Sequence, residues 1–275
     1  MKPTAFDYLR ADNIEEALAA LAEYGERARI LAGGQSLIAM VNFRLLEPEL
    51  LVDIANVKSL RYIRPVDGSL EIGATITQAE LMAWPELEKQ VPLVARALPH
   101  LGHMQTRNRG TVCGSIAHAD PSSELPLCLA TLGGDVVLRS ARGERVLGAD
   151  AFQTGMLATA RADDEMVTAV RLPLRQPGDG HAFDEMALRR GDFAVTSVAA
   201  VANGEAVRLG VGGVADRPTL RNWDGLADDA IDDALNAFAW ELGGQDDIHA
   251  SARYRRELVR RLGRRVIEEA RSCRA

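Results

Sequence analysis

Two adjacent glycines, Gly33 and Gly34, directly follow residues 29–32, a short apolar segment with the pattern of a buried strand. Such a pair allows positive φ angles and lets a ligand approach the main chain closely. Successive N–H groups in a turn of this kind can bind an anion, and the side chains of Gln35 and Ser36 can add donors. Taken alone, the turn favours the alternative of a ligand-free strand-to-helix connection, because its spacing matches neither G-x-G-x-x-G nor a Walker A loop.

The segments on either side of this turn indicate a small α/β unit. Residues 13–25 show the apolar stripe of an amphipathic helix, with Asp12 or Asn13 as its N-cap and Gly25 at its end. Residues 49–54 form the next predicted strand. The order helix, strand, glycine turn and strand is the pattern of such a unit.

A break in composition at residues 173–180, with two prolines and two glycines, divides the rest of the chain. We place a domain boundary near residue 175. The strands predicted by apolar patterning lie at residues 70–74, 136–138, 166–172, 193–202 and 206–214. The predicted helices lie at residues 78–82, capped by Thr77 and Glu80, and at residues 92–101 and 250–270.

A second polar, glycine-bearing segment covers residues 102–124, and we expect it to be irregular. A loop of this length inside a compact domain is usually functional or disordered. Thr111, Gly114 and Ser115 can donate hydrogen bonds to a diphosphate. Asp120 and Glu124 can accept hydrogen bonds from ribityl or ribose hydroxyls. A surface loop with ordinary turn chemistry is the alternative, and it is the weaker one because the run of specific polar groups is long.

Charge and cysteine content exclude several classes of protein. The 275 residues include 32 Lys and Arg against 39 Asp and Glu, a formal net charge of −7 that disfavours nucleic-acid binding. No apolar run approaches the roughly 20 residues of a membrane helix, so no membrane insertion is expected. The first residues lack the apolar stretch of a signal peptide, which predicts a cytoplasmic protein. The three cysteines form no C-x-x-C pair, so we expect no metal site in this chain and buried thiols at Cys113 and Cys128.

Histidines and a basic C-terminal segment suggest other sites. His100 and His103 lie three residues apart, but ordinary loop histidines are favoured over a metal site. His118 is expected to order its loop by hydrogen bonding rather than to act as an acid or base. Residues 251–275 hold nine arginines and three glutamates. They predict a docking helix with solvated or paired arginines, with RNA or an anionic membrane surface as the alternative.

Five segments together carry a resemblance to a known family. They are AGGQSL (32–37), RNRGTVCGSIAHADPSSELP (107–126), LRRGDFAVTSVAAV (188–201), LGVGGVADRPTLR (209–221) and ASARYRRELVRRL (250–262). In this order they resemble the FAD-binding medium subunit of molybdenum hydroxylases, the family of xanthine dehydrogenase and carbon monoxide dehydrogenase. The resemblance spans nearly the whole chain.

The resemblance implies an α+β protein. Residues 1–175 would form a two-sub-domain FAD-binding fold of the vanillyl-alcohol-oxidase/PCMH type, with sub-domains 1–55 and 56–175. Residues 176–275 would form a small C-terminal domain for packing and subunit docking, with a three-stranded antiparallel sheet and helices. FAD would lie between the two sub-domains, with both glycine segments holding its diphosphate.

The resemblance also implies the cofactor-binding residues and no catalytic or metal-binding ones. The matching positions are Leu31, Ala32, Gly33, Gly34, Gln35, Ser36, Leu37, Leu101, Thr111, Gly114, Ser115, Ala117, Asp120, Glu124, Val167, Glu185 and Phe193. Two residues depart from the pattern. Cys113 stands where many relatives have glycine, which would put a thiol near the cofactor, and Glu185 stands where many have lysine, which removes a cation.

The implied function is that of an electron-transfer flavoprotein. Partners would be a small subunit with two [2Fe–2S] clusters and a large molybdopterin subunit, assembled as a dimer of heterotrimers. Electrons would pass from the clusters through FAD to an external acceptor. A free-standing FAD-dependent oxidoreductase with its own substrate is the alternative, and an assembly module that has lost FAD is a third hypothesis.

Overall fold

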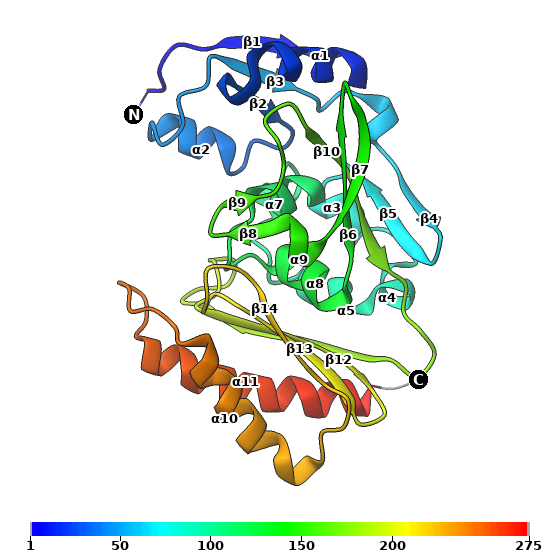
Figure 1. Ribbon diagram of the computed structural model, residues 1–275, viewed down its shortest axis with the longest axis vertical. Helices are drawn as coiled ribbons and strands as arrows, with labels where there is room; N and C mark the ends of the chain where they lie inside the picture. The colour runs from blue at the N-terminus through cyan, green and yellow to red at the C-terminus, as the bar shows by residue number, and fades with distance from the viewer. Residues whose placement is uncertain (1, 274–275) are drawn as a thin grey trace.

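The computed structural model describes residues 2–273 as three main sheets with their helices, arranged in chain order along the long axis, and one small two-stranded sheet (Figure 1). The first sheet is parallel, in the order β1 (Asp7–Arg10), β3 (Leu50–Asp53), β2 (Ala28–Leu31). Helix α1 (Ile14–Tyr24) packs against it, and α2 (Leu37–Asn42) follows β2. The predicted caps of α1 are confirmed, since the Asn13 side chain accepts a hydrogen bond from the Glu16 N–H and Gly25 ends the helix.

The second sheet is antiparallel, and helices lie against it (Figure 1). Its order is β4 (Ile63–Val66), β5 (Ser69–Gly73), β10 (Met166–Pro173), β6 (Asp135–Ser140), β7 (Gly143–Gly148). The helices of this unit are α3 (Gln78–Met82), α4 (Leu87–Gln90), α5 (Pro92–Ala97), α6 (Met104–Arg107), α7 (Val112–His118), α8 (Glu124–Leu132) and α9 (Ala149–Phe152). A small hairpin, β8 (Gln153–Gly155) with β9 (Ala158–Thr159), completes it. The capping box predicted for Thr77 and Glu80 is confirmed at the start of α3.

The third sheet is antiparallel, in the order β11 (Gly180–Met186), β12 (Thr196–Asn203), β13 (Ala206–Gly212), β14 (Thr219–Trp223). Helices α10 (Ile231–Leu242) and α11 (Ala252–Ser272) cover one face, and α5 and α8 of the preceding unit contact the other (Figure 1). Short 3-10 turns lie at Gly25–Arg27, Lys58–Leu60 and Asp228–Ala230. Within residues 2–273, no helix is both long and apolar enough to cross a lipid bilayer.

The expected three-stranded sheet of the C-terminal domain is wrong, because this sheet has four strands. Strand β11 begins in the composition break where we expected a linker. The face of β11 that packs against α5 carries His181, Phe183 and Glu185, so no apolar run reveals the strand. Its partner β12 also starts later than predicted, at Thr196 rather than at Phe193.

The prediction that residues 102–124 are irregular is wrong as well, since α6 and α7 lie within them. Both helices are short, and their glycines and hydroxyls resemble loop composition. Tertiary contacts stabilise them: the Val112 N–H donates to the Ile76 carbonyl, and Thr111 pairs with Thr77 in an isolated β-bridge. The helix predicted at residues 92–101 is confirmed in its first part and ends at Ala97.

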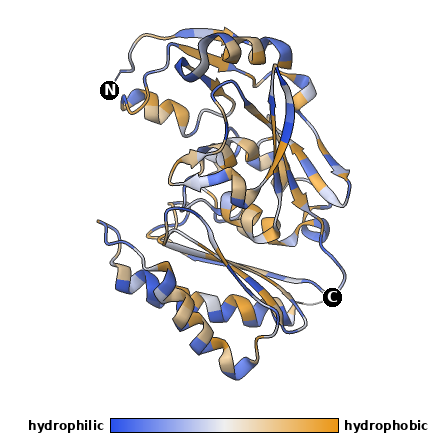
Figure 2. Cartoon of the chain, viewed as in Figure 1, coloured by the Kyte–Doolittle hydropathy of each residue, from blue (hydrophilic) through white to orange (hydrophobic). Residues whose placement is uncertain are grey.

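Two apolar clusters form the interior. The larger one joins the first two sheets to their helices and includes Phe152, Leu93 and Leu98. The smaller one lies between the third sheet and α10 and α11, and includes Phe238 and Val259. Colours alternate along α10 and α11 in Figure 2 because each helix buries one face and exposes the other.

Arginines of the basic helix α11 pair with acidic residues of the same chain. Arg261 contacts Glu257 one turn earlier, Arg264 contacts Asp232 of α10, and Arg265 contacts Asp184 of β11. These pairs agree with the expectation that arginines of this helix are solvated or paired. Exposed ion pairs of this kind contribute little stability each.

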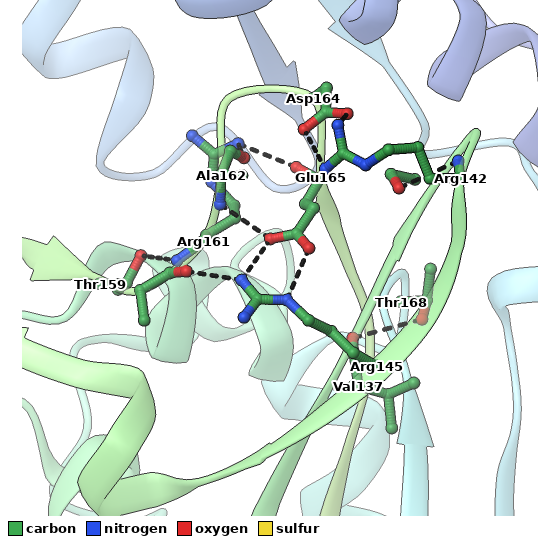
Figure 3. Close-up of polar contacts among 11 residues, drawn as sticks. Val137, Arg142, Arg145, Thr159, Arg161, Ala162, Asp164, Glu165 and Thr168 are labelled. Atoms are coloured by element: carbon green, nitrogen blue, oxygen red, sulfur yellow. Dashed lines mark hydrogen bonds and ion pairs between the residues drawn. The ribbon is translucent and has the colours of Figure 1, made fainter.

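A buried carboxylate orders the connection between β9 and β10 (Figure 3). Glu165 accepts two hydrogen bonds from the Arg145 guanidinium, at 2.6 and 2.7 Å, and one from the Ala162 N–H at 2.8 Å. Arg161 donates to the carbonyl oxygens of Ala162 and Glu165. The bonds from Arg145 and Ala162 lower the pKa of the Glu165 carboxyl.

We expect Glu165→Gln to lower the free energy of unfolding at neutral pH by about 1 to 2 kcal/mol, because the ion pair is lost while Arg145 stays partly solvated. Folding lowers the pKa of the Glu165 carboxyl. The ion pair therefore stabilises the protein above pH 4.5, the ordinary pKa of this carboxyl, and this contribution is lost as the pH falls through the pKa of the folded state. Urea unfolding at several pH values measures the difference in free energy of unfolding between wild type and variant. Glu88→Gln, at an exposed position of α4, is the control. A difference between wild type and Glu165→Gln that stays constant as the pH falls from neutral into the acid range would contradict this assignment.

Candidate functional site

The turn between β2 and α2 presents unused hydrogen-bond donors. Gly34 has a φ of +72°, as expected of a glycine turn, whereas Gly33 does not adopt a positive φ. Within residues 2–273, the backbone N–H groups of Gly33, Gly34, Gln35 and Ser36 donate to no protein atom. Ser36 precedes α2 without making a side-chain capping bond. The turn therefore offers main-chain N–H groups that can donate hydrogen bonds to a bound anion.

The second glycine-bearing segment forms the start of α7 rather than a loop. Thr111 is its N-cap, and its hydroxyl accepts a hydrogen bond from the Gly114 N–H at 3.0 Å. Val112, Cys113 and Ile116 face the core, whereas Gly114 and Ala117 lie exposed on the other side of the helix. Small residues on that side allow close approach to the helix backbone.

Cys113 does not place its thiol at the exposed side of α7. The sulfur donates toward the Ile72 carbonyl of β5 at 3.4 Å, and burial raises the pKa of the thiol. The residue is helical and its φ is not positive, so a cysteine fits here without backbone strain. The expected buried thiols at Cys113 and Cys128 are confirmed.

The two glycine-bearing segments meet directly. A Cβ atom at Gly33 would overlap the Arg109 carbonyl oxygen and lie 2.7 Å from the Gly110 Cα. Gly110 in turn accepts a hydrogen bond from the Gln78 N–H at 2.9 Å. Glycine at position 33 is therefore required for the contact, and the unused donors of the first turn lie beside the segment that leads into α7.

Acidic residues lie where α8 meets the third sheet. Asp120 accepts a hydrogen bond from the Ser122 N–H, and the hydroxyls of Ser115 and Ser123 lie 3.0 Å apart, which joins α7 to α8. Glu124, the first residue of α8, is 3% exposed. Burial, with a smaller contribution from the charge of Glu185, raises the pKa of its carboxyl to about 8.

The remaining predicted residues occupy different environments. Leu101 and Val167 belong to the larger core cluster. Phe193 is 58% exposed in the connection between β11 and β12. That connection contacts the segment after Leu101, since a Cβ at Gly191 would lie 2.6 Å from the His103 ring. Half-buried or exposed positions around the first turn are taken by Leu31, Ala32, Gly33, Gly34, Gln35, Ser36 and Leu37.

The sequence reasoning missed one residue beside these segments. Gln78 is buried, its amide oxygen has no hydrogen-bond partner within residues 2–273, and it would contact a Cβ at Gly110. His100, which we expected to be an ordinary loop histidine, lies 3.5 Å from Glu185, and its ring is tilted by 59° against that of Phe183 with 5.3 Å between the ring centroids. The capping box at Thr77 gave a signal for the helix start but none for what Gln78 contacts. In the part of the chain that the structure describes, no three His, Cys, Asp or Glu side chains gather as a metal site requires.

Comparison with known proteins defines the class. The family described as "FAD binding domain in molybdopterin dehydrogenase" matches residues 4–175. The chain is 37% identical to the nicotine 6-hydroxylase medium subunit of Paenarthrobacter nicotinovorans, covering 98% of this chain and 99% of that protein. It is 35% identical to the 6-hydroxypseudooxynicotine dehydrogenase complex subunit alpha of the same organism, covering 98% and 96%. A carbon monoxide dehydrogenase structure from Hydrogenophaga pseudoflava superposes over 100% of both chains with a TM-score of 0.94 at 28% identity.

These matches define a flavoprotein component of molybdopterin-dependent oxidoreductases. The chain belongs to the family of FAD-binding medium subunits of molybdenum hydroxylases, as its sequence motifs predicted. The site fits the cofactor of this family. Within residues 2–273, the N–H groups at residues 33–36 donate to no protein atom and suit a diphosphate without any lysine, and Gly114 and Ala117 are exposed on α7.

Proposed function

We propose that this chain carries the FAD of a cytoplasmic, multi-subunit molybdenum hydroxylase and passes electrons from a partner's [2Fe–2S] clusters to an external acceptor. The partners would be a small iron–sulfur subunit and a large molybdopterin subunit, in a dimer of heterotrimers. FAD, when bound, supplies the redox-active ring of this chain. The protein supplies the binding surface, the orientation of the ring and its electrostatic environment.

One observation carries the proposal: the turn at residues 33–36 holds N–H groups that donate to no protein atom within residues 2–273, and it contacts the segment leading into α7 through Gly33. The proposed diphosphate site consists of these donors, the capped start of α7 at Thr111, the exposed Gly114 and the half-buried Ser115. Backbone donors of this kind can hold a dianion in an acidic chain.

The other predicted residues take proposed roles around this centre. Asp120 and Glu124 would face hydroxyl groups of the cofactor, and Ala117 would pack against it from α7. Exposed Phe193 would lie near the ring system. Leu101 and Val167, which belong to the larger core cluster, would pack behind the ring system. Glu185 would affect the cofactor through its charge rather than by contacting the phosphates.

Reconstitution of the purified full chain with FAD tests the proposal. We expect a bound chromophore that absorbs blue light, bleaches on reduction with dithionite and returns in air. If the protein retains no FAD at micromolar FAD concentration, this function is excluded. The hypothesis of an assembly module that has lost FAD would then be favoured. Turnover of an organic substrate by the chain alone would instead favour the free-standing oxidoreductase.

A further inference from the structure

The bend between α5 and α6, residues 98–103, lies against the connection between β11 and β12. A Cβ atom at Gly191 of that connection would lie 2.6 Å from Nδ1 of His103 and 3.0 Å from the Gly102 carbonyl oxygen. Gly191 has a φ of +87°, so this position requires glycine both for its conformation and for the close approach. The bend is therefore a direct contact between the second unit and the connection that carries Phe193.

One arginine stabilises this bend. Arg107, the last residue of α6, donates from Nη1 to the carbonyl oxygens of Leu101 and Gly102, at 2.8 and 2.7 Å. Gly102 has a φ of +52°, and a Cβ there would lie 3.2 Å from the Thr106 side chain. The main chain thus brings two consecutive carbonyls to one guanidinium. Hydrogen bonds from a charged donor are stronger than those between neutral groups.

The side chain of Arg107 makes no other polar contact with the described part of the chain. The residue is half-buried, and within residues 2–273 its guanidinium forms no ion pair and no further hydrogen bond. The two carbonyls of the bend are therefore its protein partners, and its effect on the structure is an effect on the bend.

The connection between β11 and β12 has little other support. Within residues 2–273, its residues 187–194 form no hydrogen bond with any other segment, and the ion pair of Arg189 with Asp192 lies inside the connection. Several of these residues, Phe193 included, line a cavity of about 460 Å³. The position of the connection relative to the second unit therefore depends on the packing of Gly191 against the bend.

We propose that Arg107 is a positioning residue for the cofactor: it stabilises the bend on which the connection rests, and it thereby sets the position of Phe193 against the ring of FAD. This inference rests on the proposed function, because that function places Phe193 near the ring system. Arg107 acts through the bend rather than by contacting the cofactor.

The link from α6 to the proposed diphosphate site does not depend on this guanidinium. The N–H groups of Arg109 and Gly110 donate to the Thr106 carbonyl at 3.1 and 2.7 Å, so main-chain hydrogen bonds stabilise the segment that contacts Gly33. Loss of the Arg107 side chain should therefore change the environment of the ring much more than the binding of the diphosphate.

Limited trypsin digestion of the FAD-free full chain tests the effect on the connection. Arg189 and Arg190 are exposed there. We expect cleavage after these residues to be about tenfold faster in Arg107→Met than in wild type, since cleavage follows the local opening of a segment. Arg107→Lys keeps a cationic donor and should be cleaved more slowly than Arg107→Met. Arg253→Met removes the same charge at an exposed position of α11 and should match wild type.

Visible circular dichroism of the FAD-loaded chain tests the effect on the cofactor, because it reports the environment of the flavin ring. Arg107→Met and Phe193→Ala should each lose the same part of the flavin signal, and the double variant should lose no more than Phe193→Ala alone. Gly191→Ala displaces the connection from the His103 ring while Arg107 stays intact, so it should lose this part as well. The Kd of Arg107→Met for FAD should stay within about threefold of the wild-type value.

Thermal unfolding without FAD shows whether Arg107→Met is folded, and Arg107→Lys and Gly191→Ala carry the test if it is not. A folded Arg107→Met protein with the cleavage rate and flavin signal of Arg253→Met would overturn the proposal while FAD binding stands. Additive losses in the double variant with Phe193→Ala would overturn it too. If wild type binds no FAD, the proposed function is overturned, whereas the digestion still decides whether Arg107 stabilises the connection.

Discussion

Replacing Gly33 with alanine is expected to weaken FAD binding by about ten- to a hundredfold, since overpacking of this kind costs about 1 to 3 kcal/mol. The added methyl would overlap the Arg109 carbonyl oxygen and approach the Gly110 Cα. Both obstacles are backbone atoms, so no side-chain rotation can relieve the overlap. The turn must move away from the segment leading into α7, and its free N–H groups then no longer share a site with Thr111.

Equilibrium dialysis of the purified variant with FAD measures this effect, and Gly225→Ala is the matched control. At Gly225 a Cβ would meet its nearest atom, Glu205 Oε2, at an ordinary 3.8 Å, and φ is not positive. Thermal unfolding in the absence of FAD checks that Gly33→Ala remains folded. A folded Gly33→Ala protein with the affinity of Gly225→Ala would show that the diphosphate lies elsewhere.

The parts of this fold that were predictable from sequence are those that local chemistry determines. The capping bond at Asn13 and the capping box at Thr77 depend on residues three positions apart, and both appear as predicted. Strand β10 matches its apolar pattern because it lies buried in the middle of the second sheet. The family motifs added what local chemistry could not, because they predicted that two glycine-bearing segments distant in sequence lie together, and Gly33 does contact Arg109 and Gly110.

Features that depend on tertiary packing were not predictable. Helix α7 is stabilised by its bridge to Thr77 and by the hydrogen bond to the Ile76 carbonyl, so its own composition resembles a loop. Strand β11 presents His181 and Glu185 on the face that packs against α5, and His100 lies 3.5 Å from Glu185 there. Glu124 and Glu185 are far apart in sequence, so the effect of the Glu185 charge on the pKa of Glu124 follows from the docking of α8 on the third sheet.

The docking of the third sheet also depends on one buried arginine of α11. Arg255 is 5% exposed. Its guanidinium donates to the carbonyl oxygens of Val195 and Gly213 and pairs with Asp247 at 2.5 Å. The Gly213 N–H donates in turn to the Pro121 carbonyl at 2.8 Å, at the turn that leads into α8. Arg255 therefore holds the start of β12, close to the exposed Phe193, and the end of β13. Through Gly213 it also supports the turn that precedes Glu124.

Arg255→Met is expected to lower the free energy of unfolding by about 3 kcal/mol, because methionine fills much of the same volume but loses the guanidinium hydrogen bonds to the Val195 and Gly213 carbonyls and the ion pair with Asp247. Urea unfolding measures the loss, and Arg253→Met at an exposed position of the same helix is the control. Hydrogen exchange should also accelerate at the amides of Val195 and Gly213. If Arg255→Met and Arg253→Met unfold with the same free energy and exchange alike, the buried guanidinium does not hold these strand ends, and the position of Phe193 must depend on other contacts.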